Sequence, residues 1–160
     1  MSNHANRVKW SRYVWGAWVQ PKHSFCSWLV FCGSLLTEDK LIQRGITDSS
    51  KCHLCEQHRE NTKHLFFECS FSKQVFTGVK VLLSITSDTR NANWEWKILF
   101  AQCCRGGVVV EILKVYISAT VYHLWAERNT RKHSGKKTAA RIILEKVLKE
   151  TKFYLQHSYQ

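Results

Sequence analysis

Three cysteines and one histidine constrain the fold of this chain more than any other sequence feature. Cys52 and Cys55 form a C-x2-C pair, His64 follows after eight residues, and Cys69 follows after four more. Structural zinc is held in a tetrahedron of thiolates and imidazoles. A tight turn can direct both sulfurs of a C-x2-C pair to one ion, and a histidine and cysteine at the entry to a helix can complete the set. The pattern predicts one bound zinc.

The sequence leaves alternatives to this ligand set open. The C-x2-C pair could be a redox pair, although such a pair would not account for the histidine and cysteine that follow. His53 and His58 lie in the same segment, so either imidazole could replace His64. A catalytic zinc keeps one position open for water, whereas three thiolates and an imidazole fill all four. We therefore expect a structural zinc.

Composition favours a helical domain around this segment. Hydrophobic residues make up 44% of the 160 residues, and the chain has one proline and only seven glycines. This content is enough for a core but has few turn residues for a fold of many short strands. We expect a mainly α fold of about six helices in one domain at residues 8–156, with a zinc loop at 51–70.

Apolar periodicity and helix-capping residues predict where the helices lie. Pro21 suits a first helical turn, and Thr37 and Ser70 are predicted N-caps. Cys103 and Cys104 are expected to be buried thiols. The expected helices cover 21–32, 37–45, 70–83, 94–104 and 108–130, with a last helix whose apolar pattern covers 138–154 and which forms a basic amphipathic C-terminal helix at about 136–156.

The formal net charge of +12 suits a polyanion, most often nucleic acid and less often a membrane surface. Residues 128–152 carry nine basic and two acidic side chains, a balance of +7. Alternatively, the positive charge serves only to keep the protein soluble. We predict sequence-nonspecific contacts with RNA or DNA phosphates through Lys136, Lys137, Arg141, Lys146, Lys149 and Lys152.

Charged residues also argue against a membrane span. The longest apolar run, 108–126, is interrupted by Glu111, Lys114 and His123, which fits a buried helix better. The odd count of seven cysteines and the polar start of the chain favour a reduced, intracellular protein.

Two short segments could have either a structural or a nucleic-acid-binding role. Phe66 and Phe67 could stack on bases, but at least one of them is expected in the core. The segment 127–129, Glu-Arg-Asn, could contact RNA backbone. The helix before it is mostly apolar, so we favour a structural role, with Arg128 buried against an acid.

Several sequence blocks in order resemble the zinc-binding domain found C-terminal to the reverse transcriptase of plant LINE-type (non-LTR) retrotransposons. They include Pro21-Lys22, the C-x2-C pair, Glu60, the segment HLFFEC at 64–69 and Trp125-Ala126-Glu127-Arg128-Asn129. The resemblance implies a non-catalytic module that assists a polymerase copying RNA at a nicked DNA target. Partners would be RNA or DNA and a reverse transcriptase polyprotein, in the nucleus rather than the cytoplasm.

Departures from the family pattern suggest a domesticated or truncated copy. Leu36 replaces a frequent proline, Phe76 replaces a usual tryptophan, and the basic segment 130–133 replaces an apolar pair. The chain has three aspartates and no paired-aspartate motif, so we do not expect an enzyme. The alternative function is a protein-interaction or scaffold domain whose zinc is purely structural.

Overall fold

The computed structural model describes residues 15–84 and 107–158, and its elements in this part of the chain are helical. They are the α-helices α2 (Pro21–Phe31), α3 (Glu38–Gln43), α4 (Ser70–Leu82), α6 (Val108–Ser134) and α7 (Ala140–Ser158), and the short π-helix η1 (His64–Glu68). The only β-pairing in these ranges is an isolated bridge between Lys51 and Arg59. The predicted mainly α fold is confirmed. The predicted helix at 94–104, with Cys103 and Cys104, lies outside the described residues.

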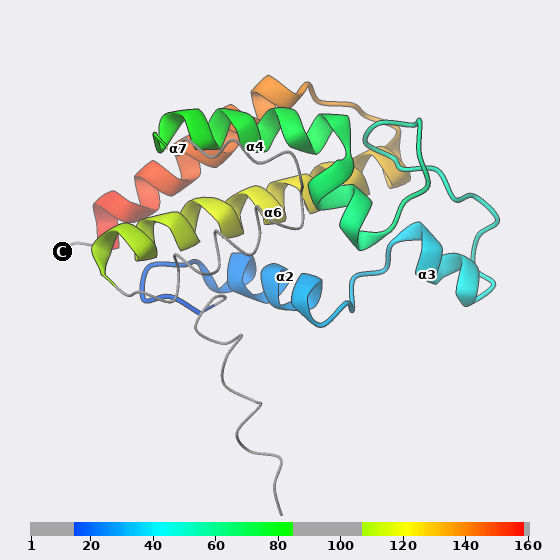
Figure 1. The fold of residues 1–160 in the computed structure, drawn as a ribbon, viewed down its shortest axis with the longest axis horizontal. Coiled ribbons are helices and arrows are strands. Elements are labelled where there is room, and N and C mark those ends of the chain that lie inside the picture. Colours follow the sequence, from blue (N-terminus) through cyan, green and yellow to red (C-terminus); the bar gives the residue numbers. More distant parts are fainter. Residues whose placement is uncertain (1–14, 85–106, 159–160) are drawn as a thin grey trace, which may run out of the picture.

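Helix α6 is the centre of the fold. It packs against α2, α4 and α7, and Figure 1 shows it running through the middle of the molecule between α2 and α4. By length and composition alone α6 could cross a membrane, but half of its most apolar window is buried inside the protein. Its buried side chains include Val115, Val121 and Leu124. The helix therefore forms the core, as its nearly continuous apolar surface predicts.

Backbone signals in the sequence set most helix ends. Pro21 opens α2, whose end is followed by Gly33 at φ 60°. Gly45 and Gly135 take φ values of 67° and 69° just after α3 and α6. Left-handed backbone of this kind favours glycine because other residues clash through Cβ. The predicted start at Pro21 is confirmed, and the predicted ends of the first two helices, near residues 32 and 45, agree with the positions of Gly33 and Gly45.

Three predicted boundaries are wrong in detail. Ser70 is the first residue of α4, and Cys69 holds the N-cap position. Helix α6 continues to Ser134 rather than ending near residue 130. Helix α7 begins at Ala140, so Lys136 and Lys137 lie in the linker before it and not in the helix. Within this linker, the backbone N–H of Thr138 donates to Glu127 Oε1 of α6 at 2.7 Å.

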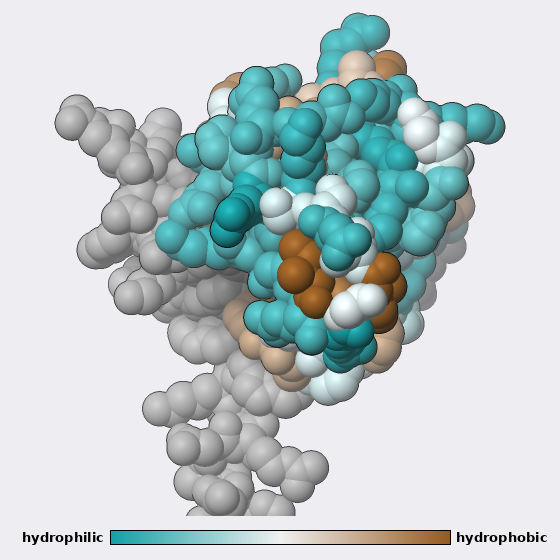
Figure 2. All heavy atoms as spheres, turned by 90° about the vertical axis from the view of Figure 1, so that its right-hand side faces the viewer, coloured by the Kyte–Doolittle hydropathy of each residue, from teal (hydrophilic) through white to brown (hydrophobic). Residues whose placement is uncertain are grey.

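The zinc-loop segment lies at the end of the molecule that carries α3, where the C-terminal end of α6 also lies (Figure 1). The surface at that end is mainly hydrophilic, with a small hydrophobic area (Figure 2). Beneath it, Cys52 and Cys69 belong to the same buried cluster as Leu65, Phe66 and Leu124. The predicted metal-binding segment is therefore part of the main core and not an appendage to it.

Candidate metal centre

The first two cysteines lie on a tight turn. The backbone N–H of Cys52 donates to the carbonyl of His58 at 2.8 Å, and that of Glu56 donates to the carbonyl of Cys52 at 2.8 Å. Glu56 takes a positive φ of 58° to close the turn. A C-x2-C pair on such a turn can present both sulfurs to one ion.

The histidine and the third cysteine lie at the two ends of η1. The amide of Cys69 donates to the carbonyl of His64 at 2.8 Å, the five-residue spacing of a π-helix. In an α-helix, side chains five residues apart point about 140° away from each other. The wider π turn brings them round to the same side. The side-chain oxygen Oδ1 of Asn61 accepts a hydrogen bond from the backbone N–H of His64 at 2.8 Å and fixes the start of this turn.

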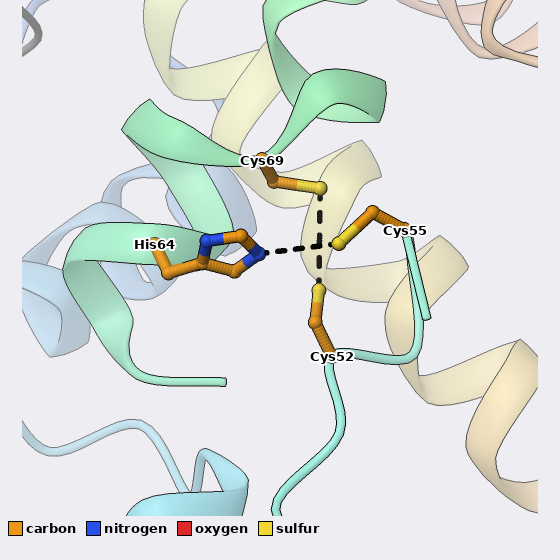
Figure 3. A group of neighbouring side chains, drawn as sticks. All are labelled: Cys52, Cys55, His64 and Cys69. Carbon is orange, nitrogen blue, oxygen red and sulfur yellow. Dashed lines mark hydrogen bonds between the residues drawn. The ribbon is translucent and has the colours of Figure 1, made fainter. Parts of the chain in front are cut away.

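The four predicted ligands converge. One ligand atom from each lies within 4.8 Å of every other, and Figure 3 shows the four side chains pointing to a common centre. The Cys52 and Cys69 sulfurs are 4.0 Å apart, and Cys55 Sγ lies 3.3 Å from His64 Nε2. Zinc with bonds of about 2.3 Å to sulfur and about 2.0 Å to nitrogen has edges of about 3.8 and 3.5 Å. The residues fit a tetrahedral zinc.

Electrostatics at Cys69 favour a thiolate. Its hydrogen bond with Cys52 lowers the pKa of Cys69 and raises that of Cys52, burial opposes the lowering at Cys69, and the backbone N–H groups of Ser72 and Phe71 add to it. Those N–H groups belong to the first turn of α4, where the helix dipole stabilises negative charge. Cys69 therefore has a reason to stand at the N-cap position that the sequence assigned to Ser70.

The other imidazoles of the loop are placed differently. His53 Nε2 contacts Glu38 Oε1 at 2.9 Å, so that ring is directed to an acid. The ring of His58 is exposed, and its Nδ1 lies 4.0 Å from Cys55 Sγ. His64 is only 5% exposed and belongs to the converging group. The geometry selects His64 from the three candidates.

The environment of the centre suits a structural ion. Cys52 and Cys69 are fully buried, and Leu54, Leu65 and Phe66 are buried around them. Three thiolates and an imidazole complete a tetrahedron, so no position remains for water. Phe66 is in the core, which confirms that at least one of the two phenylalanines is core filler, and Phe67 is partly buried against the same cluster.

A buried ion-pair network, which the sequence only partly predicted, lies between the zinc loop and α6. Arg128 is 2% exposed, and its Nη2 donates to Glu38 Oε1 at 2.7 Å and to Glu60 Oε1 at 2.6 Å. Lys132 also contacts Glu38. The structural role favoured for the Glu-Arg-Asn segment is confirmed. Its acidic partners were not identified from sequence, although Glu60 is one of two acids, with Glu56, between the second and third zinc ligands.

A second set of contacts joins the loop to the start of α7. Arg131 donates to the carbonyl of Leu54 through Nη1 and to the carbonyl of Thr138 through Nη2, both at 2.8 Å. Its Nε donates to Glu127 at 2.8 Å. One side chain of α6 thus holds the zinc loop and the linker before α7 together.

The six residues predicted to meet nucleic acid are all exposed, and they are Lys136, Lys137, Arg141, Lys146, Lys149 and Lys152. Lys137 lies 2.7 Å from Glu56 of the zinc loop, and Arg141 lies 3.7 Å from Glu145. The basic linker therefore adjoins the loop on the surface.

Comparison with known proteins agrees with this centre. Residues 1–76 match a family model described as zinc-binding in reverse transcriptase, and this range contains all four ligands. Neither a curated protein nor a solved structure matches the chain. The matched segment and the Cys3His geometry together support a zinc-binding module of the reverse-transcriptase-associated kind, with one structural zinc.

Proposed function

We propose that this chain is a non-catalytic nucleic-acid-binding module related to the C-terminal part of plant LINE-type reverse transcriptases. The family similarity of residues 1–76 supports the link to reverse transcription, and the net charge of +12 supports a polyanionic partner. The coordination-saturated zinc supplies no site for hydrolysis or polymerisation. A module that serves reverse transcription at a DNA target would work in the nucleus, beside a polymerase.

The observation that carries the proposal is that the C-terminal basic residues fall into two groups, those paired with acids of the fold and those exposed at the surface. Of the nine between 128 and 152, Arg128, Arg131 and Lys132 are held by acids of the fold. The six others are exposed, and two of these have an acidic neighbour at the surface. The internal ion pairs thus account for three charges, and the exposed excess remains available to phosphates.

The exposed charges of α7 share one side of the helix. Its buried residues Ile143, Val147 and Thr151 recur every four positions and face the core. At 100° per residue, Arg141, Lys149 and Lys152 fall within about 80° of one another and opposite this face. Lys146 lies about 60° from Lys149 and about 60° from Ile143, at the edge of this exposed side. Helix α7 can therefore dock on α6 and α4 and still present a basic face to a nucleic-acid backbone.

Such a face positions a backbone and does not read sequence. Lysine and arginine contacts to phosphates carry no base information, and they release counterions, so affinity falls steeply with salt. Phe66 is buried and has no surface to offer a base. We expect similar affinity for unrelated RNA sequences of equal length.

Salt-dependent RNA binding of a matched pair of variants tests the proposal. Changing Lys136, Lys146, Lys149 and Lys152 to Gln should weaken binding and reduce the slope of log K against log salt by up to about 3 to 4. The control removes four exposed charges elsewhere, at Arg44, Lys51, Lys63 and Lys73. This control variant should keep most of the slope of log K against log salt that the unmodified chain shows.

The outcomes separate the rival functions. Equal losses in the two variants would mean that net charge and not α7 attracts RNA. No binding by the unmodified chain near physiological salt would favour the scaffold alternative, in which zinc and helices form only a platform for another protein.

A further inference from the structure

A second group of metal-binding side chains lies where three helices meet. His23 of α2, His123 of α6 and Glu150 of α7 place one ligand atom each within 4.8 Å of the other two. His123 Nε2 is 2.6 Å from Glu150 Oε2, and His23 Nε2 is 3.6 Å from Glu150 Oε1. Among the described residues, this is the one such group besides the Cys3His centre.

The buried nitrogen of His23 is the unusual feature of this cluster. His23 is 1% exposed, yet its Nε2 has no hydrogen-bond partner among the described residues, since 3.6 Å is too long for a bond. A buried polar atom without a partner is unfavourable and calls for an explanation. The atom points toward Glu150 and so toward the position that a shared ion would take.

The donor set matches a transition metal rather than magnesium. Two imidazoles and one carboxylate are a known zinc-binding set that leaves a fourth position for water. Imidazole suits zinc, copper, nickel and cobalt, whereas magnesium prefers oxygen.

We propose that His23, His123 and Glu150 form a second metal site, which binds Zn²⁺ or a similar transition-metal ion and links α2, α6 and α7. His23 and Glu150 are 127 positions apart in the sequence. An ion bound by both would therefore close a loop of that length. This site is weaker than the Cys3His centre because it has three protein ligands and no thiolate.

Lys22 competes for the same carboxylate. Its Nζ lies 2.6 Å from Glu150 Oε1, where an ion bridging the cluster would also bind. Its side chain is 48% exposed, and Nζ already lies 5.0 Å from the centre of the Tyr122 ring. Lys22 can therefore leave Glu150 for solvent and keep its contact with the ring. Removing Lys22 should strengthen metal binding.

A cobalt titration of the chain carrying one equivalent of zinc tests the proposal. The zinc fills the Cys3His centre, and added Co²⁺ reports on the second site through its d–d absorption. We expect one further equivalent of Co²⁺ without a sulfur-to-cobalt charge-transfer band, because the second site has no thiolate. The melting temperature should rise as Co²⁺ is added.

Four variants assign the binding to these residues. His123→Gln and Glu150→Gln should each weaken Co²⁺ binding by more than about 100-fold, while circular dichroism and the first zinc are unchanged. Lys22→Gln should strengthen it by about tenfold. Lys63→Gln, which removes another lysine paired with a glutamate at 2.6 Å, is the matched control and should have no effect.

Any one of the following results would overturn the proposal. They are the absence of a second equivalent in the unmodified chain, a second equivalent that survives His123→Gln and Glu150→Gln, and a charge-transfer band that places the added cobalt on cysteine. Weaker binding in Lys22→Gln would also contradict it, because Lys22 would then support the metal rather than compete with it.

Discussion

The guanidinium of Arg128 donates through Nε to both carboxylate oxygens of Glu60, at 3.0 and 3.2 Å, across 68 positions of sequence. Glu60 lies in the zinc loop between the second and third ligands, and Arg128 lies near the end of the central helix. Both side chains are almost fully buried. This ion pair fixes the metal-binding segment to α6, so the stability of the loop depends on the helix as well as on zinc.

Arg128→Ala should destabilise the zinc-loaded protein by about 3 to 5 kcal/mol, because it leaves the carboxylates of Glu60 and Glu38 buried without their main partner. Chemical denaturation at neutral pH measures the change. Arg141→Ala removes an arginine that is 80% exposed and should change stability by no more than about 0.5 kcal/mol. A loss below about 1 kcal/mol for Arg128→Ala would show that water or other groups replace the pair easily.

Zinc should depend on the converging residues and on no other cysteine of the described part. Cys55→Ser should lose the ion, whereas Cys32→Ser, at an exposed cysteine outside the cluster, should retain it. Structural zinc contributes on the order of 10–16 kcal/mol, as much as a domain's whole stability of about 5–15 kcal/mol. Elemental analysis and circular dichroism measure both effects. Full zinc in Cys55→Ser would refute the ligand set.

The choice between the histidines needs a separate pair of variants. His64→Ala should lose zinc, and His58→Ala should keep it, because only His64 Nε2 lies in the group of ligand atoms. The reverse result would move the fourth ligand to His58, whose Nδ1 lies 4.0 Å from Cys55 Sγ.

Acid should destabilise the linker before α7 through Glu127. Burial alone would raise the pKa of Glu127, but hydrogen bonds from Arg131 and Thr138 hold it below its usual value of 4.5. The ionised form stabilises the fold, so this contribution is complete above pH 4.5 and is lost as pH falls through the lower folded-state pKa. Glu127→Gln should cost about 1.5 to 3 kcal/mol at neutral pH.

The same variant should flatten the decline of stability in acid. Zinc ligands also take up protons at low pH, so zinc release is followed separately with a chelating dye. We expect Glu127→Gln to change the stability profile and leave the zinc-release profile where it is. If both profiles move together, the acid effect belongs to the metal centre and not to Glu127.

Removing zinc should also loosen the linker at 135–139. Arg131 bonds at once to the carbonyls of Leu54 and Thr138, so disorder in the loop removes one anchor of the linker. Hydrogen exchange of the protein after chelation should accelerate at 135–139 and in the first turn of α7, and less in the middle of α6. Unchanged exchange in the linker would show that Glu127 alone holds it.

Local signals in the sequence predicted the helices and the metal centre because both depend on neighbouring residues. Pro21, Gly33, Gly45 and Gly135 act through their own backbone preferences, and the spacing of four ligands is itself a local geometry. The π turn at 64–68 was not predicted. It arises because His64 and Cys69 must face the same ion, and no residue preference within the segment indicates it.

Contacts between distant segments could not be predicted. The Arg128–Glu60 pair was foreseen only as an arginine against some acid, since nothing local identifies a partner 68 positions away. His23, His123 and Glu150 lie on three helices and form no sequence motif. Cys69, and not the predicted Ser70, takes the N-cap position of α4. Its sulfur belongs to the group of metal ligands and also accepts hydrogen bonds from backbone N–H groups of the first turn of α4.

X-ray absorption at the zinc edge, on the purified chain with one equivalent of zinc, tests the central claim most directly. We predict three sulfur neighbours at about 2.3 Å and one nitrogen neighbour at about 2.0 to 2.1 Å, with no water oxygen in the coordination shell. A shell of nitrogen and oxygen atoms alone, or one with fewer than three sulfurs, would contradict a zinc held by Cys52, Cys55, His64 and Cys69.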